Sequence, residues 1–446
     1  MVVVFLLVLV VVLALLGAVH WYVWRRLVRD LTAAGGTARR VGTALAVALP
    51  LLSLGALVSG RVGAPFRLQQ IVAWPGFLWL AVLLYLTLAL VVTEPLRPLL
   101  RRVLARRGEG GAGAEIVADA EPEAHAGAGS AVAAGAAAAT VQAPAEAPAQ
   151  APADAPAQAP AQAPAPASVP DPSRRLFVNR IVSGTAAAVA LGTVGAGTYG
   201  VLRGPRVKRV TVPLAKLPRA AHRYRIAVVS DIHLGPILGR AHTQRIVDTI
   251  NATQPDLIAV VGDLVDGTVQ DLGPAAEPLA RLRARDGAFF VTGNHEYFSG
   301  ADAWVDHVRE LGMHPLRNAR VEIGAGFDLA GVDDVAGESE GQGPDFAKAL
   351  GDRDRARTAV LLAHQPIVID DAVAHGVDLQ LSGHTHGGQL WPGNYLAELA
   401  NPTVAGLERY GDTQLYVSRG AGAWGPPVRV GAPSDITVVE LASRQA

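Results

Sequence analysis

The chain has 446 residues, half of them hydrophobic and none of them cysteine, and its formal net charge is zero. The lack of cysteine excludes a disulfide framework and thiolate ligands, so that a metal could be held only by His, Asp, Glu or Asn. Residues 1–210 carry 19 Lys and Arg against 10 Asp and Glu, whereas residues 211–446 carry 20 against 29. The acidic second half argues against a nucleic-acid partner, and arginines between apolar runs in the first half suggest a membrane.

Three charge-free apolar runs occupy the N-terminal region, at residues 1–24, 41–59 and 71–93. As a helix that rises about 1.5 Å per residue, the first run would reach roughly 36 Å, enough to cross the hydrocarbon core of a bilayer. It has no basic segment before it and no small-residue cleavage site, which favours an anchor over a removed secretory signal. Helices of a soluble bundle are the alternative, which charge-free runs of this length disfavour. The sequence therefore predicts a transmembrane region of three helices over residues 1–107.

The arginines predict an orientation for these helices. Five arginines lie between the first and second runs, two between the second and third, and five follow the third. Cytoplasmic loops carry the excess of Lys and Arg, so the first loop and the segment after residue 93 are predicted to be cytoplasmic and the N-terminus to be outside.

Residues 108–172 include the Ala/Pro tract APAEAPAQAPADAPAQAPAQAPAPA and are predicted to be a disordered linker, because such a tract cannot bury a core. Residues 173–209 follow as a weaker apolar segment. Its start is similar to a twin-arginine export signal, with Arg174, Arg175 and Phe177 in the expected places, and the alternative is a plain fourth transmembrane helix. Both interpretations place residues 210–446 outside the cytoplasm.

From residue 210 onward, short β-branched runs alternate with amphipathic segments. Runs such as YRIAVVS, DLIAVV and TAVLLA predict buried strands, and residues 240–253, 275–285 and 302–311 are predicted to be helices. This alternation indicates an α/β domain. After Gly388, the runs QLYVS and ITVVEL predict shorter strands that complete the sheet without long helices.

Five predicted strands each end in polar residues that can bind metal. The motifs are VVSDIHLG, VVGDLVDG, VTGNHEYF, LLAHQP and LSGHTHGG, and they supply Asp231, His233, Asp263, Asp266, Asn294, His295, Glu296, His364, His384 and His386. Ligands bind beyond the carboxyl ends of strands in open α/β sheets, so the five motifs are expected to converge. Two divalent metals there would clamp phosphoryl oxygens and lower the pKa of a bridging water. The mixture of His and Asp suits Mn, Fe or Zn better than Ca or Mg.

These motifs resemble those of the calcineurin-like metallophosphoesterases, and the resemblance covers about residues 223–441. The longer form GHTHGGQ is similar to the bacterial branch of membrane-associated or twin-arginine-exported phosphoesterases. The resemblance implies a four-layer α/β/β/α sandwich and two metal ions. It implies that one metal is held by Asp231, His233, Asp263 and His386, and that the other is held by Asp263, Asn294, His364 and His384. It also implies that His295 is a catalytic residue that binds no metal, and that Asp266 pairs with it.

Other candidates lie outside these motifs. The sequence favours a surface or structural role for five further histidines, His222, His242, His307, His314 and His375. Asp333 and Asp334 fall in DLAGVDDVAGES, where a solvated turn is favoured over a place at the mouth of the site. Trp424 either faces the substrate or caps the core, and the sequence leaves both alternatives open.

The leading prediction is a multi-pass cell-membrane protein whose exported domain hydrolyses phosphate esters with two divalent metals. A second hypothesis keeps this chemistry but moves the substrate into lipid, either a nucleotide-diacylsugar pyrophosphate, as for a UDP-diacylglucosamine hydrolase, or a phospholipid headgroup. A third is a catalytically inactive membrane receptor or scaffold.

Overall fold

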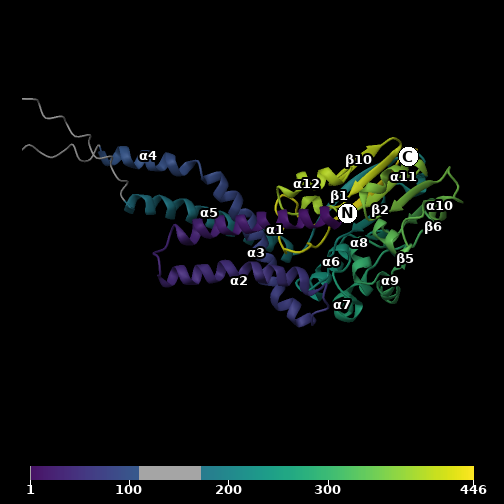
Figure 1. The fold of residues 1–446 in the computed structure, drawn as a ribbon. Helices are drawn as coiled ribbons and strands as arrows, with labels where there is room; N and C mark the ends of the chain where they lie inside the picture. The colour runs from purple at the N-terminus through teal and green to yellow at the C-terminus, as the bar shows by residue number, and fades with distance from the viewer. Residues whose placement is uncertain (1, 110–171, 446) are drawn as a thin grey trace, which may run out of the picture. The chain divides into compact units, whose positions relative to one another are not determined.

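The computed structural model describes residues 2–109 and 172–445 (Figure 1). The chain divides into two compact units, one formed by residues 1–97 and 179–446 and the other by residues 98–178. Nearly all of the predicted linker, residues 108–172, lies outside the described residues.

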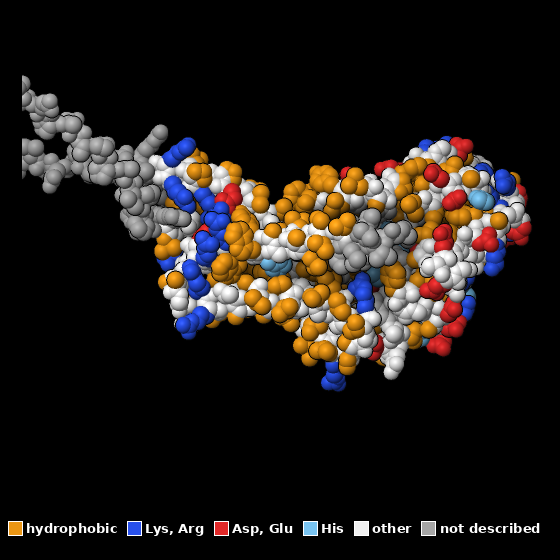
Figure 2. Space-filling model, viewed as in Figure 1, with side chains coloured by type: hydrophobic (Ala, Val, Ile, Leu, Met, Phe, Trp, Pro, Cys, Tyr) orange, Lys and Arg blue, Asp and Glu red, His pale blue; other side chains and the backbone are white. Residues whose placement is uncertain are grey.

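Four long apolar helices precede the sheets: α1 (Val2–Trp24), α2 (Thr37–Ser59), α3 (Phe66–Thr93) and α5 (Pro172–Leu202). A shorter basic helix, α4 (Leu96–Glu109), follows α3. Four segments have the length and composition to cross a membrane: Val10–Arg29, Thr37–Ser59, Phe66–Thr93 and Leu176–Leu202. Hydrophobic side chains cover much of the visible face of the helices (Figure 2), as expected of a surface that lipid contacts.

Close packing and one polar cluster join these helices. A Cβ at Gly76 of α3 would lie 2.4 Å from the backbone oxygen of Leu52 in α2, so only glycine permits this approach. Near the ends of α1 and α3, the Arg26 guanidinium lies 2.7 Å from the Glu94 carboxylate. Arg97 lies beside the same carboxylate and donates to Asn179 of α5 at 3.2 Å. Arg26, Glu94 and Arg97 are called the polar cluster below.

Two six-stranded sheets form the remainder of the first unit. The first has the order β1-β12-β2-β3-β4-β5, and the second has the order β10-β11-β9-β8-β7-β6. In the first sheet the strands are β1 (Arg206–Leu214), β12 (Asp435–Ser443), β2 (Tyr224–Val229), β3 (Leu257–Val261), β4 (Ala288–Val291) and β5 (His314–Pro315). In the second they are β10 (Gly406–Tyr410), β11 (Thr413–Val417), β9 (Leu379–Ser382), β8 (Thr358–Leu362), β7 (Phe327–Gly331) and β6 (Ala319–Ile323).

The central strands are parallel and buried on both faces. β2, β3 and β4 pair in parallel in the first sheet, and β7, β8 and β9 do so in the second. Along β2, Ile226 and Val228 belong to the core that both sheets share, whereas Ala227 and Val229 belong to a second core. This period of two is the alternation of side chains along a strand, and it explains why these strands are continuous apolar runs in the sequence.

Helices cover the outer faces of the sheets. The second core contains residues of α6 (Arg240–Ala252), α7 (Val269–Ala276) and α9 (Ala301–Glu310) together with β2, β3 and β4. A third core joins α10 (Phe346–Leu350) and α11 (Ile369–Ala374) to β7, β8 and β11. Parallel sheets need such cover because their connections run across the faces.

Two segments differ from the sequence-based expectation. The sequence predicts a helix over residues 275–285, but the helix in this region, α7, begins earlier and ends at Ala276. A 3₁₀ turn follows over Glu277–Arg281. Pro278 explains the change, because it lacks the N–H that a continued α-helix would use. The second difference is an added short helix, α12 (Gly393–Ala400), between Gly388 and the last strands.

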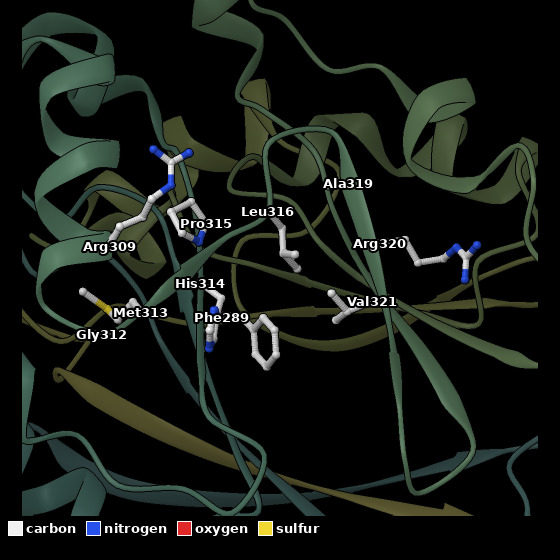
Figure 3. A pocket seen from close by; sticks show the side chains of 10 residues that line it. All are labelled: Phe289, Arg309, Gly312, Met313, His314, Pro315, Leu316, Ala319, Arg320 and Val321. Carbon is white, nitrogen blue, oxygen red and sulfur yellow. The ribbon is translucent and has the colours of Figure 1, made fainter.

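A surface pocket of about 750 Å³ lies where β4 and β5 approach β6 (Figure 3). Its lining includes Phe289, His314, Leu316 and Val321, and the close-up shows Phe289 and Val321 among predominantly apolar neighbours. The pocket contains none of the residues of the five strand-end motifs, so it is a feature separate from them.

Gly422 allows the segment after β11 to pack closely on the end of β2. A Cβ at this position would lie 1.9 Å from the backbone oxygen of Ile232, and backbone cannot move aside as a flexible side chain can. We expect Gly422→Ala to lower the free energy of unfolding by about 1–3 kcal/mol, the usual cost of overpacking. Thermal unfolding of the full chain measures this. Gly324→Ala is the control, because a Cβ there meets no atom within 4 Å, and equal melting temperatures for the two variants would contradict the packing argument.

Candidate metal centre

The metal-capable residues lie at the ends of five strands. Asp231 and His233 follow β2, Asp263 follows β3, and Asn294 begins the short helix α8 (Asn294–Ser299) after β4. His364 follows β8, and His384 and His386 follow β9. The parallel strands of each sheet end at one edge, and the two edges lie together, so motifs up to 155 positions apart meet.

The backbone at these strand ends adopts an uncommon conformation. Five of the site residues have positive φ, namely Asp231 at 54°, His233 at 50°, Asp263 at 51°, His384 at 72° and His386 at 53°. Left-handed backbone is costly for residues that carry a Cβ, and it accumulates at sites where the surrounding structure enforces it. Here the sharp turns after β2, β3 and β9 direct these side chains toward a common centre.

Three groups of residues could each hold a metal ion, and the third of them, His233, Asp266 and His295, shares His233 with the first. The first consists of Asp231, His233 and His386, and the second consists of Asp263, His364 and His384. In the first group His386 Nε2 lies 3.0 Å from His233 Nε2 and 3.3 Å from Asp231 Oδ1. In the second group His384 Nδ1 lies 3.0 Å from Asn294 Oδ1, which adds an amide oxygen to that group.

Asp263 lies between the first two groups. Its Oδ2 atom is 3.1 Å from His364 Nε2 in one group and 3.8 Å from His233 Nε2 in the other. Its Oδ1 atom accepts a hydrogen bond from the backbone N–H of His295 at 2.9 Å, which orients the carboxylate. A single carboxylate therefore faces both groups, the arrangement that a bridging ligand requires. His384 and His386 fall in different groups, although only Thr385 separates them.

His295 and Asp266 form a hydrogen-bonded pair beside the first two groups. Asp266 Oδ1 accepts from His295 Nδ1 at 2.7 Å and from His233 Nδ1 at 2.9 Å. The other nitrogen of His295, Nε2, lies 4.0 Å from Asp263 Oδ2. Asp266 thus orients both His295 and His233, whereas the family resemblance implied only the contact with His295.

The donor set fits divalent metal ions. His364 Nε2 is buried 3.1 Å from Asp263 Oδ2, but the two atoms lack hydrogen-bond geometry, which leaves the ring nitrogen available to a metal ion. Burial alone would lower the pKa of His233, but Asp266, Asp263 and Asp231 outweigh it and raise that pKa to about 9. Likewise, Asp263 and Asp231 raise the pKa of His364 despite its burial. The carboxylates thus favour positive charge at this position. A ligand set of imidazole nitrogens and carboxylate oxygens is one that suits Mn, Fe or Zn.

Two supporting residues received no role from the sequence: Glu296 was named only among the metal-capable residues of its motif, and Arg429 was not named. Glu296 is fully buried and accepts hydrogen bonds from the backbone N–H groups of Gly293, Asp263 and Leu264 at 2.6, 3.0 and 2.7 Å. Burial, and then the charge of Asp263, raises the pKa of Glu296 to about 7. Arg429 donates to His386 at both its ring Nδ1 and its backbone oxygen, each at 3.0 Å. The GNHE motif contained a signal for Glu296, but nothing in the sequence near Arg429 indicated this contact.

Asp333 and Asp334 correct the expectation of a solvated turn. Both are buried, and they follow β7, the neighbour of β8 in the second sheet. Asp333 accepts from Arg317 at 2.6 Å, and Asp334 accepts from Gln365, the residue after His364, at 2.9 Å. The segment is thus a sixth strand end at this edge. Its signal was the apolar run FDLAG, which was too short to recognise as a strand.

The remaining candidates are also placed. Trp424 is about half exposed, and its ring centroid lies 5.7 Å from that of His295, so it faces the site and does not cap the core. His242 is buried, which agrees with a structural role, and His314 lies in the separate pocket. His222 accepts a hydrogen bond from the backbone of Ser443, and the rings of His307 and His375 pack on Trp304 and Phe346. None of these five histidines belongs to the three groups among the described residues.

Comparisons with known proteins point to one kind of protein. The family model for calcineurin-like phosphoesterases matches residues 224–388. A zebrafish (Danio rerio) transmembrane protein with a metallophosphoesterase domain is 38% identical over 55% of this chain and 59% of its own length, so the chain spans less than two thirds of that relative. An uncharacterised metallophosphoesterase of Helicobacter pylori strain J99 is 37% identical over 60% of this chain and 73% of its own. An uncharacterised metallophosphoesterase of Aquifex aeolicus is 35% identical over 53% of this chain and 91% of its own length.

Glu296 offers a test of how the backbone supports the centre. In Glu296→Gln one acceptor oxygen becomes an NH₂ group that faces a backbone N–H, at a cost of about 1–3 kcal/mol. Because two of the three bonds hold Asp263 and its neighbour, we expect a lower melting temperature and an affinity for Mn²⁺ at least tenfold weaker by isothermal titration calorimetry. Glu310→Gln, at a largely exposed side chain on α9, is the control. Unchanged Mn²⁺ affinity in Glu296→Gln would exclude this supporting role.

Proposed function

The chain belongs to the calcineurin-like phosphoesterase family, and from this premise we propose that it hydrolyses phosphate esters with two divalent metal ions in a membrane-tethered domain outside the cytoplasm. The single observation that carries the proposal is the position of Asp263, with one carboxylate oxygen facing both groups of ligands. Two ions that share such a ligand can hold one phosphoryl group between them.

Each protein group has a defined task in this proposal. Metal ions bound by the two groups would neutralise the charge of the phosphoryl oxygens and supply an activated water. Asp266 accepts the Nδ1–H of His295, so Nε2 is the nitrogen left to face the centre. From there Nε2 donates a proton to the oxygen that leaves phosphorus, in the manner of a general acid. The backbone N–H of His295 holds the Asp263 carboxylate, which ties the acid to the bridging ligand.

The proposed topology places the catalytic domain outside the cytoplasm. Four candidate spans and the excess of arginine in the loop before α2 and after α3 support an external N-terminus, a cytoplasmic linker and an external domain. With α5 as the fourth span, the chain leaves the membrane directly before β1. The name of the zebrafish relative supports a membrane location.

An inactive scaffold is the less favoured alternative. A domain that only binds a partner has no need to keep Asn294, His364 and His384 with their donor atoms in reach of one another. A lipid-linked substrate is the better-supported alternative to a soluble one, and the contact between the site loops and the membrane helices favours it.

Substitution of Asp263 and His295 tests the chemistry. With Mn²⁺, Fe²⁺ or Zn²⁺, we expect the full chain in detergent to hydrolyse bis(p-nitrophenyl) phosphate. Asp263→Ala removes the shared ligand and should abolish metal binding and activity together. His295→Ala should lower kcat by about 10²–10⁴-fold, the usual contribution of a general acid, and retain the metals.

His314→Ala is the control, since this exposed histidine lies outside the centre. Metal content by plasma mass spectrometry separates the two variants. Wild-type turnover in either Asp263→Ala or His295→Ala would refute the assignment.

A further inference from the structure

The helix α12 exposes an apolar surface beside the metal centre. Trp391, Tyr395, Leu396 and Leu399 are 51%, 59%, 71% and 85% exposed, and no residue of α12 is buried. At 100° per residue, Tyr395, Leu399, Leu396 and Ala400 cover a continuous arc of about 140°. A soluble surface rarely presents four adjacent large apolar side chains in this way. The side chains of Tyr395, Leu396 and Leu399, together with that of Trp391 just before the helix, are called the α12 surface.

The α12 surface is continuous with the membrane helices. The Tyr85 hydroxyl of α3 donates to the backbone oxygen of Trp391 at 2.9 Å, two residues before α12 begins. Leu390 and Val430, on either side of this contact, pack against the apolar cluster that α1, α3 and α5 form, and Val428 is a buried member of it. Figure 1 shows α12 at the edge of the two-sheet region nearest these helices.

The position of Tyr85 along α3 sets the depth of this contact. Tyr85 precedes Glu94 of the polar cluster by nine residues of the same helix. At 1.5 Å per residue this is about 14 Å, less than half of the roughly 30 Å of bilayer hydrocarbon. On the proposed topology the polar cluster lies at the cytoplasmic headgroup layer, so the Trp391 loop of the external domain would extend from the outer headgroup layer down to the acyl chains. Apolar side chains at that depth are stabilised by contact with the acyl chains, because they are not exposed to water there.

The same segment is attached directly to the metal centre. A Cβ at Gly388, two residues after His386, would lie 2.3 Å from the Asn394 backbone, so α12 packs directly on the metal loop. Gln389 joins this loop to the Trp424 loop, because its side chain donates to Trp424 O at 2.8 Å and accepts from Trp424 N at 3.0 Å. Trp424 and Phe298, both exposed, place their rings 5.7 and 5.5 Å from that of His295.

We propose that the α12 surface is embedded in the bilayer and that the metal centre hydrolyses the phosphate ester of a lipid that remains anchored there. The inference rests on the proposed function and names its substrate class. Water adds its oxygen to phosphorus, the bond from phosphorus to the ester oxygen breaks, and that oxygen takes a proton from His295. The lipid tail lies along the α12 surface, and Trp424 and Phe298 form an apolar mouth for the glycerol backbone. A soluble ester would need neither the α12 surface nor this apolar mouth.

The first experiment measures depth. The chain has no cysteine, so Leu399→Cys creates a unique site for a nitrobenzoxadiazole label. In vesicles of phosphatidylcholine and phosphatidylglycerol, we expect nitroxide groups on the acyl chains to quench this label strongly. Asp352→Cys, at a side chain 84% exposed on the catalytic domain, is the control and should escape quenching. Equal quenching at the two positions would overturn the proposal.

The second experiment measures substrate selection. In the same vesicles, containing phosphatidate and phosphatidylglycerol, we expect Leu396→Glu/Leu399→Glu to lower phospholipid hydrolysis at least tenfold and to leave bis(p-nitrophenyl) phosphate hydrolysis within twofold of wild type. Val373→Glu, an exposed apolar position on α11, is the matched control and should change neither rate.

The outcomes separate the two proposals. A wild-type chain loaded with metal that does not hydrolyse the soluble diester would refute the proposed function. A wild-type chain that hydrolyses the soluble diester but neither phospholipid would refute the lipid inference alone. Equal loss of both activities in the double variant would also refute it, since α12 would then support the centre and not the lipid.

Discussion

The carboxylate of Asp263 is the constraint on which the rest of the catalytic unit depends. It is buried at a strand end with left-handed backbone, and its two oxygens make separate contacts with His295 and with the two ligand groups. A carboxylate buried in this way is costly unless positive charge faces it. Burial would raise its pKa, but His364, His233 and His295 outweigh burial and lower it. The same demand for positive charge makes the position suitable for metal ions.

The arrangement of the two sheets brings the other motifs to that carboxylate. β2, β3 and β4 bring their ends from one sheet, and β8 and β9 bring theirs from the other, across a core that both sheets share. The backbone N–H groups that Glu296 accepts, and the contacts of Arg429 with His386, then hold the loops that follow the strands. These groups touch neither metal nor substrate in our proposal, yet they determine where the ligands lie.

The contact between Tyr85 and Trp391 extends this dependence to the membrane. The loop that carries His386 continues through Gly388 and Trp391 into α12, so the ligand loop and the apolar surface are one segment of chain. Because Tyr85 of α3 contacts this segment, the apolar helices pack directly against the loops beside the centre. In our proposal, this contact brings the metal chemistry to a substrate that stays in the bilayer.

The sequence by itself determined the α/β class, the apolar helices and the candidate residues of the centre. Each of these follows from a periodic apolar run or from a short motif directly after a strand. The family resemblance implied different metals for His384 and His386, and the two histidines fall in different groups of residues. Only the tertiary structure placed Asp266 against His233 as well as His295, buried Asp333 and Asp334 at a sixth strand end, and brought Arg429 to His386. It alone placed α12 beside α3. These contacts join residues far apart in the chain, and their geometry depends on how two sheets and a helical bundle pack, which no local pattern records.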